Sequence, residues 1–392
     1  MASHALKARN LMPHVRALAQ EIGPRPAGHV EEERARQYIL GALDNLGYGQ
    51  VEALTFPAHD TWGYALGNPL ALGLLSNLLP KRGRLLGGLA TLACTYTLWD
   101  AMRINKQPLS ALSPQRPSAT LIVRIPPAET PRRTLVMLAH TDSNKHRPSF
   151  SPALKKALPG AATFALGSLL SNGLAQVAEA FGGGRGARRL RTASAVGIVA
   201  SLAITLLDEL GGYVPGANDN ASAVACALGL AAHLRDHPLQ HTEVWLAFTG
   251  AEEVGCLGAH ALLDRYGEEL RDAWFLDFEM VGSHEIAYVT RHSGFALVTA
   301  YRPDPESLAW AEATARRHPE LGIGGREMII GEEVGALRSR GFRGLCLSGV
   351  GPDGWLENWH QHSDNIDNLV AAGLEKAARF AWAMMQELDA RP

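Results

Sequence analysis

The chain has 392 residues, with 37 basic residues against 39 acidic ones, and 46% of its residues are hydrophobic. This length allows one large domain or two, and the apolar fraction is enough for a full core. The net charge of -2 gives no basis for binding nucleic acid. The four cysteines are far apart in apolar surroundings, so we expect buried free thiols and no disulfide framework.

The first part of the chain begins with two expected helices. Residues 1–7 lack the apolar core of a signal peptide, so we expect a cytoplasmic protein. Residues 5–22 have apolar positions at helical spacing, and the glycine- and proline-rich segment 23–28 ends this helix. A second helix is predicted over residues 30–46, and the alternation in residues 50–56 predicts a strand.

Two stretches of the chain, about 60–104 and about 150–213, each contain a pair of uncharged apolar runs joined by a basic turn. The four runs are residues 62–80, 85–99, 157–178 and 193–207. Each pair predicts a helical hairpin inserted into the surrounding chain. The two hairpins are similar to each other, and together they could form one helical subdomain.

The remaining chain alternates strands and helices. The predicted strands are residues 119–125, 134–139, 243–248, 274–279, 286–290 and 344–350. The predicted helices are residues 221–234, 257–266, 305–317, 334–340 and 366–388. We expect the first two of these strands to pair as a hairpin around a proline-rich turn. The alternation predicts a three-layer α/β/α sandwich with a mixed, largely parallel sheet, as one catalytic domain over residues 1–392 that contains both insertions.

Two adjacent carboxylates, Glu252 and Glu253, follow the apolar run 243–248 and lie next to glycines. Neighbouring side chains at a strand end diverge, so one carboxylate can bind a metal while the other works beside it as a base. An isolated Glu pair is usually a solvated surface feature. The end of an apolar strand in an α/β sheet is, however, where such proteins place their sites.

Other candidate residues also follow strands or lie in short loops. His140 ends an apolar run, and Asp142 two residues later could orient the imidazole of a metal-binding histidine. Asp219 precedes an alanine-rich helix, where it could cap the helix or offer its two oxygens to two metals. Glu279 ends another strand, with Asp277 on the same face as the competing ligand.

The segment before the last helix contains two histidines, His360 and His362, of which one is expected to bind a metal and the other to face solvent. Together the candidate segments supply two histidines, three carboxylates and a spare glutamate. Mixed histidine and carboxylate ligation suits zinc or a similar divalent ion. An aspartate that bridges two ions suits a two-metal site, where the spare glutamate moves protons.

The order of these motifs resembles the co-catalytic zinc exopeptidases, which include bacterial leucyl aminopeptidases, glutamate carboxypeptidase and the related glutaminyl cyclases. The resemblance covers roughly residues 5–60 and 115–390 and leaves out the two apolar hairpins. It implies that His140 binds one metal, that Asp219 bridges two zinc ions and that Glu253 is a ligand. By the same resemblance Glu252 is the general base.

The resemblance also assigns the remaining site residues. Asp142 becomes the partner of His140, and His360, four residues before Asp364, becomes the last ligand. The family usually has aspartate where this chain has Glu279, so Glu279 is the expected ligand and Asp277 stays open. Residues 331–333 (Gly-Glu-Glu) occupy the place of a Ser-Asp motif of the family, and no role is assigned to them.

The hairpins depart from the family, and three interpretations compete. They could span a membrane, form a lid over the active site or form a dimer interface. The uncharged runs are short for spanning and rich in glycine and alanine. In a cytoplasmic protein both basic turns would also be translocated, against the positive-inside tendency. We therefore favour a soluble lid or an interface between copies over membrane contact. Because His140 and Asp219 flank the second hairpin, we expect the inserted helices to shape the substrate cleft.

The sequence thus predicts a zinc-dependent exopeptidase, specifically an aminopeptidase that acts on a peptide or small amide with Glu252 as base. One alternative is a single-zinc acyl transferase similar to glutaminyl cyclases, which the Trp-His-(three residues)-Asp-Asn pattern at residues 359–365 motivates. A second alternative, of another class, is a non-catalytic scaffold on a peptidase fold that associates with a membrane through the hairpins.

Overall fold

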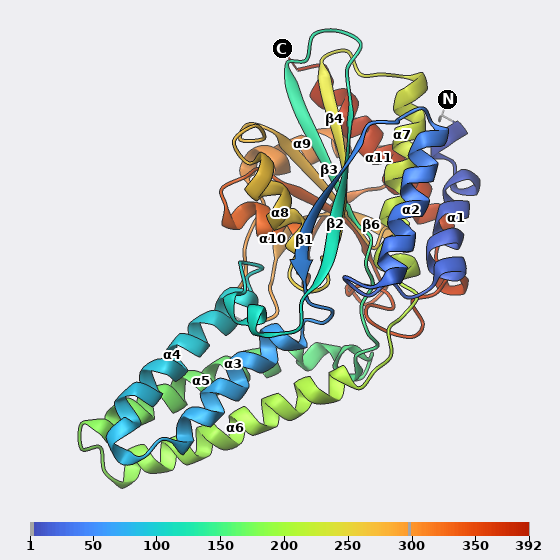
Figure 1. Cartoon of the computed structure of the whole chain (residues 1–392). Helices are drawn as coiled ribbons and strands as arrows, with labels where there is room; N and C mark the ends of the chain where they lie inside the picture. The colour runs from blue at the N-terminus through green and yellow to red at the C-terminus, as the bar shows by residue number, and fades with distance from the viewer. Residues whose placement is uncertain (1–3, 297–298, 392) are drawn as a thin grey trace.

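The computed structural model describes residues 4–296 and 299–391. Within these residues, eight strands form one mixed sheet in the order β1-β2-β4-β3-β5-β8-β6-β7 (Figure 1). The strands are β1 (Val51–Ala58), β2 (Arg116–Ile125), β3 (Arg133–His140), β4 (Thr242–Thr249), β5 (Trp274–Glu279), β6 (Glu285–His292), β7 (Gly324–Met328) and β8 (Leu345–Val350). The centre of the sheet, β4-β3-β5-β8, is parallel, and β1, β2 and the β6–β8 pairing are antiparallel.

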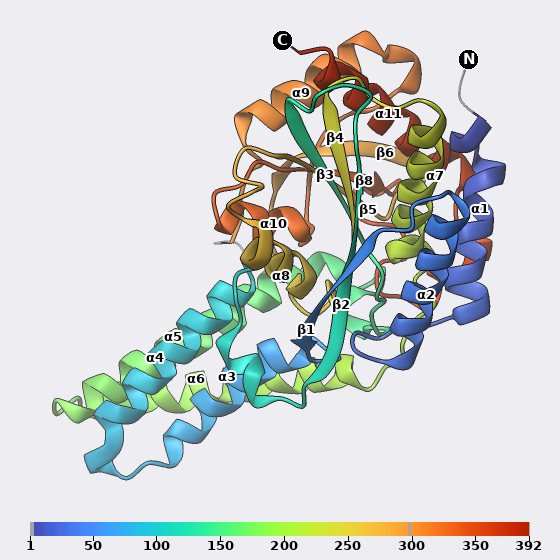
Figure 2. The same cartoon turned by 45° about the horizontal axis from the view of Figure 1, so that its top comes forward.

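The parallel strands are buried on both faces, which explains their continuous apolar sequences. In β3, Leu135 and Met137 belong to the core on one face, and Val136 and Leu138 belong to the core on the other. Helices α1, α2, α7 and α11 cover the first face, whereas α8 and α10 cover the second (Figure 2). The α/β sandwich predicted from the sequence is therefore confirmed.

The helices of this sandwich agree closely with their sequence patterns. They are α1 (Ala8–Arg16), α2 (Val30–Asn45), α7 (Ser222–Asp236), α8 (Leu257–Tyr266), α9 (Pro305–Arg317), α10 (Glu333–Ser339) and α11 (Ala371–Asp389). In α9 the side chain of Asp304 accepts a hydrogen bond from the Ser307 amide, and Pro305 occupies the first turn, where its missing N–H has no consequence. Local sequence therefore sets the start of this helix.

The expected hairpin of strands 119–125 and 134–139 is wrong, because β4 lies between β2 and β3. β2 pairs with β4 antiparallel, and β3 pairs with β4 parallel. The loop between β2 and β3 instead bonds to the segment that leads into β4. Ala128 and Arg132 donate backbone hydrogen bonds to Leu239 and His241. This contact holds the two strands one strand width apart, so a third strand fits between them.

Two helix boundaries and one strand differ from the sequence pattern. Helix α6 (Arg185–Glu209) begins eight residues before the predicted 193 and includes most of the arginine-rich turn, with Gly184 at its N-cap. Helix α11 begins at Ala371 instead of residue 366, because the Val370 amide donates to the Gly282 carbonyl and a short 3-10 turn precedes it. The edge strand β7 was not predicted, since its Gly-Gly-Arg-Glu-Met sequence is mostly exposed and carries no alternation.

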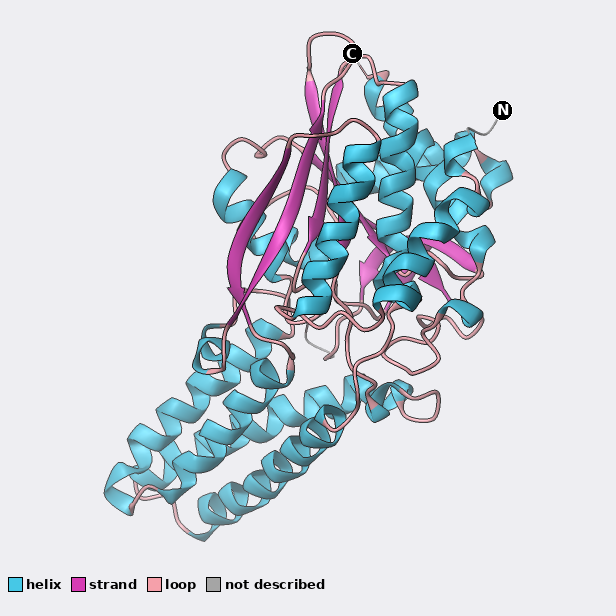
Figure 3. Ribbon diagram, turned by 45° about the vertical axis from the view of Figure 1, so that its right-hand side comes forward, coloured by secondary structure: helices cyan, strands magenta, loops and turns pink. Residues whose placement is uncertain are grey.

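The two apolar hairpins form one body, which we call the helical extension. It consists of α3 (Gly63–Leu75), α4 (Arg84–Ala101), α5 (Leu158–Ala180) and α6. Each of these helices packs against two neighbours in the cyclic order α3-α4-α5-α6. The helical extension projects away from the sheet, with the α3–α4 and α5–α6 turns at its far end (Figures 1 and 3).

Polar contacts hold the near end of the helical extension on the sandwich. The Glu209 carboxylate accepts hydrogen bonds from the Thr61 hydroxyl, the Lys145 ammonium and the fully buried Arg147 guanidinium at 2.7–2.9 Å. The neighbouring Asp208 carboxylate accepts from the Ser149 amide and hydroxyl. The helical extension is thus attached through a buried charged junction.

Candidate metal centre

The candidate ligands meet at the carboxyl ends of three adjacent strands. His140 is the last residue of β3, Glu252 and Glu253 follow β4, and Glu279 is the last residue of β5. Because these strands are parallel and share one register, with His140 opposite Thr249, their ends lie at the same edge. Asp219 enters from the segment before α7, and His360 enters from the loop before α11.

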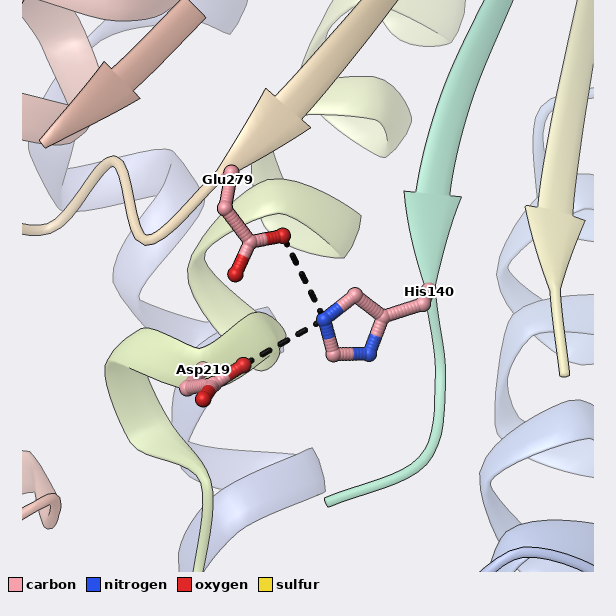
Figure 4. Close-up of side chains that lie close together, drawn as sticks. All are labelled: His140, Asp219 and Glu279. Carbon is pink, nitrogen blue, oxygen red and sulfur yellow. Dashed lines mark ion pairs between the residues drawn. The ribbon is translucent and has the colours of Figure 1, made fainter. Parts of the chain in front are cut away.

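These residues form two clusters that share Asp219. In the first, His140 Nε2 lies 3.3 Å from Asp219 Oδ1 and 3.4 Å from Glu279 Oε2 (Figure 4). In the second, His360 Nε2 lies 3.4 Å from Asp219 Oδ2 and 3.2 Å from Glu253 Oε2. The two oxygens of one aspartate therefore point at two separate histidines, which is the arrangement that a bridging ligand needs.

The donor set fits divalent cations. His140 Nε2 is buried and, by geometry, has no hydrogen-bond partner, and the same is true of Glu253 Oε1. Burial by itself would lower the pKa of His360, but Glu253 and Asp219 outweigh burial and raise it to about 9. Such a field favours positive charge at this point. Imidazole and carboxylate donors with this separation suit zinc.

Asp142 aligns the first-cluster histidine with the two glutamates. Its Oδ1 lies 3.5 Å from His140 Nδ1, so the second ring nitrogen is left for a metal. The same carboxylate accepts hydrogen bonds from the backbone amides of Glu252 (3.0 Å) and Glu253 (3.1 Å). One buried side chain therefore sets the positions of a histidine on β3 and of the loop after β4.

Glu252 lies next to the first cluster. Its Oε2 lies 3.8 Å from His140 Nε2, outside both ligand clusters, and its Oε1 accepts a hydrogen bond from the Cys256 thiol. Burial, together with the nearby carboxylates of Glu279 and Glu253, raises the pKa of Glu252 well above its ordinary value. A carboxylate with a raised pKa is a better acceptor of a proton.

The sequence left two choices of candidate ligand open, and the structure distinguishes the two residues in each choice. Glu279 belongs to the His140 cluster, whereas Asp277 lies in a different buried group with Glu332 and Cys346. His360 is buried between Glu253 and Asp219, whereas His362 is exposed and its ring stacks on His146 with centroids 4.2 Å apart.

Three polar residues support the centre and were not assigned such roles from the sequence. The Asp364 carboxylate accepts hydrogen bonds from the backbone amides of Asn218 and Asp219. Asn144 Nδ2 donates to Glu253 at 2.6 Å, and Asn220 Nδ2 donates to Glu279 at 3.0 Å. The adjacency of these residues to predicted ligands was the available signal, but a single sequence does not show in which direction an amide points.

A buried arginine also supports the centre through hydrogen bonds to the backbone of neighbouring segments. Arg25 is 1% exposed, and its guanidinium donates to the backbone carbonyls of five residues in three segments. These are Leu18, Gly23, Thr141, Pro215 and Gly216. Arg25 thus links the segment after His140 to the segment before Asp219. The sequence showed this residue only as part of a helix-breaking turn.

The segment 331–333 lies beside the centre but outside both clusters. Glu332 is the N-cap of α10, where its side chain accepts from the Val334 amide, and it is also 2.8 Å from His292 Nδ1. Burial raises the pKa of Glu333 to about 7. The capping contact gives Glu332 a structural role.

A cavity of about 310 Å³ opens onto both clusters. Its inner end is lined by Asp219, Glu252, Glu253, Glu279 and His360. Its outer wall is apolar and comes largely from the helical extension and the loops beside it; it includes Leu66, Leu70, Leu98, Met102, Phe150, Ala162, Ala165, Ile204 and Trp359. The inserted helices therefore shape this cleft, as expected from the positions of His140 and Asp219 on either side of the second hairpin.

The fold and the donor set are those of an α/β metallohydrolase, and comparisons with known proteins agree. Residues 205–385 match peptidase family M28. The match supports the resemblance to co-catalytic zinc exopeptidases over this part of the chain. The matched range begins after His140 and Asp142, so the assignment of those two residues depends on their geometry.

One curated relative and several solved structures are similar to the chain. "Probable lipoprotein aminopeptidase LpqL" of Mycobacterium tuberculosis is 26% identical over 184 residues, which are 41% of this chain and 37% of the relative. The chain therefore spans little more than a third of that relative's length. BSAP, a zinc aminopeptidase from Bacillus subtilis, superposes with a TM-score of 0.57 at 14% identity, covering 98% of this chain and 95% of its own.

A cyclase is as similar in fold as the aminopeptidases are. The glutaminyl cyclase of an Acidobacteriales bacterium has a TM-score of 0.58 at 15% identity and covers 99% of this chain and 95% of its own. The aminopeptidase from Aneurinibacillus sp. strain AM-1 has a TM-score of 0.57 at 15% identity, with 97% and 93% covered. At these identities the likeness establishes the fold, and the chemistry has to be argued from the site.

Proposed function

We propose that this protein is a zinc aminopeptidase with two zinc ions in each chain. His140, Asp219 and Glu279 would hold one ion, and Asp219, Glu253 and His360 would hold the other. The observation that carries the proposal is the pair of clusters that share Asp219. The M28 match, the aminopeptidase relative and the aminopeptidase structures support it.

When bound, the zinc ions would supply Lewis-acid polarisation of the scissile carbonyl and acidify a water. Glu252 would take the proton of the attacking water and return it to the amine that leaves. Its place in the cavity wall beside the clusters, and outside both ligand sets, suits this role. Asp142 would hold His140 and the Glu252 backbone in register, as its three contacts do in the structure.

The lining of the cavity favours an amino terminus over a carboxyl terminus as the recognised end. Among the described residues that line it, none is lysine or arginine, whereas several carboxylates lie at its inner end. Apart from the proposed zinc ions, a substrate carboxylate would find no cationic side chain of lysine or arginine there, whereas carboxylates that do not bind zinc would attract a substrate amine. The apolar outer wall suits a large apolar side chain on the N-terminal residue.

The proposal is tested by the variant Glu252→Gln. Removing a general base should lower kcat by about 10²–10⁴-fold on aminoacyl amide substrates, while zinc content stays at that of the unmodified protein. Activity and zinc by elemental mass spectrometry are measured on the same preparation. Glu285→Gln, at an exposed glutamate paired with Arg326, is the matched control and should change neither quantity. Loss of zinc in Glu252→Gln would reverse the roles of Glu252 and Glu253.

A second candidate function is the cyclisation of N-terminal glutamine with one zinc ion. The pattern at residues 359–365 and the cyclase structures favour it. A peptide with N-terminal glutamine separates the two functions, because a cyclase releases ammonia and keeps the peptide chain intact. One zinc per chain, ammonia release and no cleavage of leucyl substrates would replace the aminopeptidase proposal with this one.

A further inference from the structure

Exposed large apolar side chains are concentrated on the helical extension. Outside the extension and its turns, the described residues include three more such side chains, Val30 (57% exposed), Leu112 (70%) and Leu154 (52%). The extension and its turns carry many that are 39–81% exposed: Leu72, Leu75, Leu78, Leu85, Leu86, Leu89, Tyr96, Phe164, Leu170, Leu174, Phe181, Leu190, Val196, Val199, Ile204, Leu206, Leu207 and Leu210. A surface this apolar marks a contact with an apolar environment.

These side chains lie on all four helices of the extension. Each helix has two neighbours in the cycle α3-α4-α5-α6, so each presents its outer face in a different direction. The exposed apolar residues therefore surround the extension as a girdle and do not form one face. A second copy of the chain would cover a single side of such a body, whereas lipid surrounds it.

In the half of the extension that is farthest from the sandwich, the residues buried between the helices include several polar ones. The Gln176 side-chain amide donates to the Ser76 hydroxyl at 2.7 Å, and the Ser76 and Thr91 hydroxyls lie 2.7 Å apart. Asn172 Nδ2 donates to the Ser194 hydroxyl, and all five of these residues are buried. A water-soluble bundle has the opposite pattern, apolar inside and polar outside. Helices in lipid, by contrast, associate through such hydrogen bonds.

Small residues let the helices approach closely. A Cβ added at Gly88 on α4 would lie 2.9 Å from the carbonyl oxygen of Gly173 on α5. One added at Gly73 on α3 would lie 2.4 Å from a methyl carbon of Leu169 on α5. Contacts of this kind are typical of helix packing in membranes, where association depends on close backbone approach.

Both ends of the girdle carry basic residues. The far turns contain exposed Lys81, Arg82, Arg185, Arg188 and Arg189, and their acidic residue, Glu179, pairs with Arg84 and Arg191. At the near end, Lys155 and Lys156 precede α5, and Tyr96 and Trp99 lie near the end of α4 with Arg103 over the Trp99 ring. Anionic headgroups attract such residues, and aromatic rings favour the membrane–water interface.

The length of the girdle is compatible with a bilayer. The uncharged segment 192–207 of α6 extends over about 24 Å, and the segment 158–178 of α5 over about 32 Å. A hydrocarbon core is about 30 Å thick, and arginine stems can reach past the shorter segment to the headgroups. Among the described residues, α6 by itself is long and apolar enough to cross a membrane.

We propose that the helical extension is embedded in a lipid bilayer and spans it. The girdle then lies in the hydrocarbon, the far basic turns lie at the distant headgroups, and the catalytic domain lies at the opposite surface. Shortness, high glycine and alanine content and the basic turns were sequence arguments against spanning. The arrangement in space answers the argument from composition, because several glycines pack inside the bundle and the exposed outer faces carry leucine, valine and phenylalanine. The basic turns count against spanning only if the catalytic domain has the expected cytoplasmic location.

The test places one spin label at each of three positions of the full chain in lipid nanodiscs, since the four native cysteines are buried. Val196→Cys lies in the girdle, Gly186→Cys lies at the far turn, and Val30→Cys is the matched control on the sandwich. Val196 and Val30 are 65% and 57% exposed. A Cβ at Gly186 meets no other atom. The measured quantity is the collision rate of each label with oxygen and with a water-soluble nickel chelate.

The label at Val196→Cys is expected to collide with oxygen and to be protected from the nickel chelate. The labels at Gly186→Cys and Val30→Cys are expected to be open to the chelate. Three results would overturn the proposal. In the first, Val196→Cys is as open to the chelate as Val30→Cys. In the second, Gly186→Cys is protected, so that the far turns end inside the bilayer. In the third, the Val196→Cys protein is a soluble dimer without detergent, and its two labels couple to each other. Because the test uses no substrate, its outcome is independent of the proposed catalytic activity.

Discussion

At the scale of single residues, the candidate metal centre depends on adjacent side chains that point in different directions. Glu252 and Glu253 are adjacent, yet Glu253 points at His360 and Glu252 points toward His140. The divergence of side chains at a strand end separates them, and Asp142 fixes both backbones. A base and a ligand can therefore lie next to each other in the sequence without competing for one metal.

The two nearby histidines provide a prediction at this scale. His360→Ala should lower zinc content to at most about half of its original value, because the Asp219–Glu253 cluster loses its imidazole. His362→Ala should leave zinc unchanged, since His362 is exposed and contacts His146. Elemental mass spectrometry of both variants after identical dialysis measures this. Equal loss of zinc in the two variants would contradict the proposed ligand set.

At the scale of elements, the junction between α6 and the sandwich is the contact on which the extension depends most. Burial opposes ionisation of Glu209, but the Arg147 guanidinium and the hydrogen bonds from Thr61 and Lys145 outweigh burial and lower the pKa of its carboxyl. The folded state therefore holds Glu209 ionised more strongly than the unfolded chain does. The stability that this provides is complete above the unfolded pKa and is lost as the pH falls through the folded pKa.

Glu209→Gln should accordingly destabilise the protein by about 3 kcal/mol at neutral pH, because it leaves the buried Arg147 without its anionic partner. The difference from the unmodified protein should shrink once the pH falls below the ordinary range of a glutamate. Free energies of unfolding from guanidinium titrations in one mild detergent, over a series of pH values from 7 to 3, measure it. Glu268→Gln, at a fully exposed glutamate, should differ little at any pH. A constant difference across the series would disprove the role of this ionisation.

The helix and strand boundaries show which structural features the local sequence determines. Residues 305–317 were predicted as a helix from their pattern and form α9 over that range, because Asp304 and Pro305 act locally. Strands β2 and β3 were predicted in place but not in pairing, since β4, which separates them, comes about a hundred residues later. Pairing partners are a long-range property that the periodicity of one segment does not contain.

At the scale of the whole molecule, the sandwich supplies the ligands and the helical extension supplies the wall of the cavity. Neither part encloses the cavity alone, because Leu70 and Ala162 come from the extension and Glu279 and His360 come from the sandwich. We therefore expect the choice of substrate side chain to be set by the extension and the chemistry by the sandwich.

Ala162→Trp tests this division. A bulky ring in the apolar wall should lower kcat/KM for leucyl amides by about tenfold or more, and lower it less for alanyl amides. Zinc content should not change, because Ala162 lies outside both clusters. Ala180→Trp, on the exposed end of the same helix, is the control. An equal loss with both substrates would show that the cavity does not receive the N-terminal side chain.

The expected cytoplasmic location remains a prediction, and the arrangement of the extension favours a membrane position over the soluble lid or dimer that the sequence favoured. The membrane proposal depends on which side chains face outward. Helices α4, α5 and α6 all contain several leucines together with glycines, so composition does not distinguish a soluble bundle from an embedded one.

The sequence by itself determined the α/β class, the chemical types of the site residues and the order in which they occur, because these depend on local periodicity and on motifs within a few residues. Only the tertiary structure decided that His360 and not His362, and Glu279 and not Asp277, join the clusters. It also decided that several polar residues of the hairpins are buried between the helices while many apolar ones lie outside. Each of these outcomes depends on the direction of a side chain relative to segments distant in the chain, and that direction is set by packing.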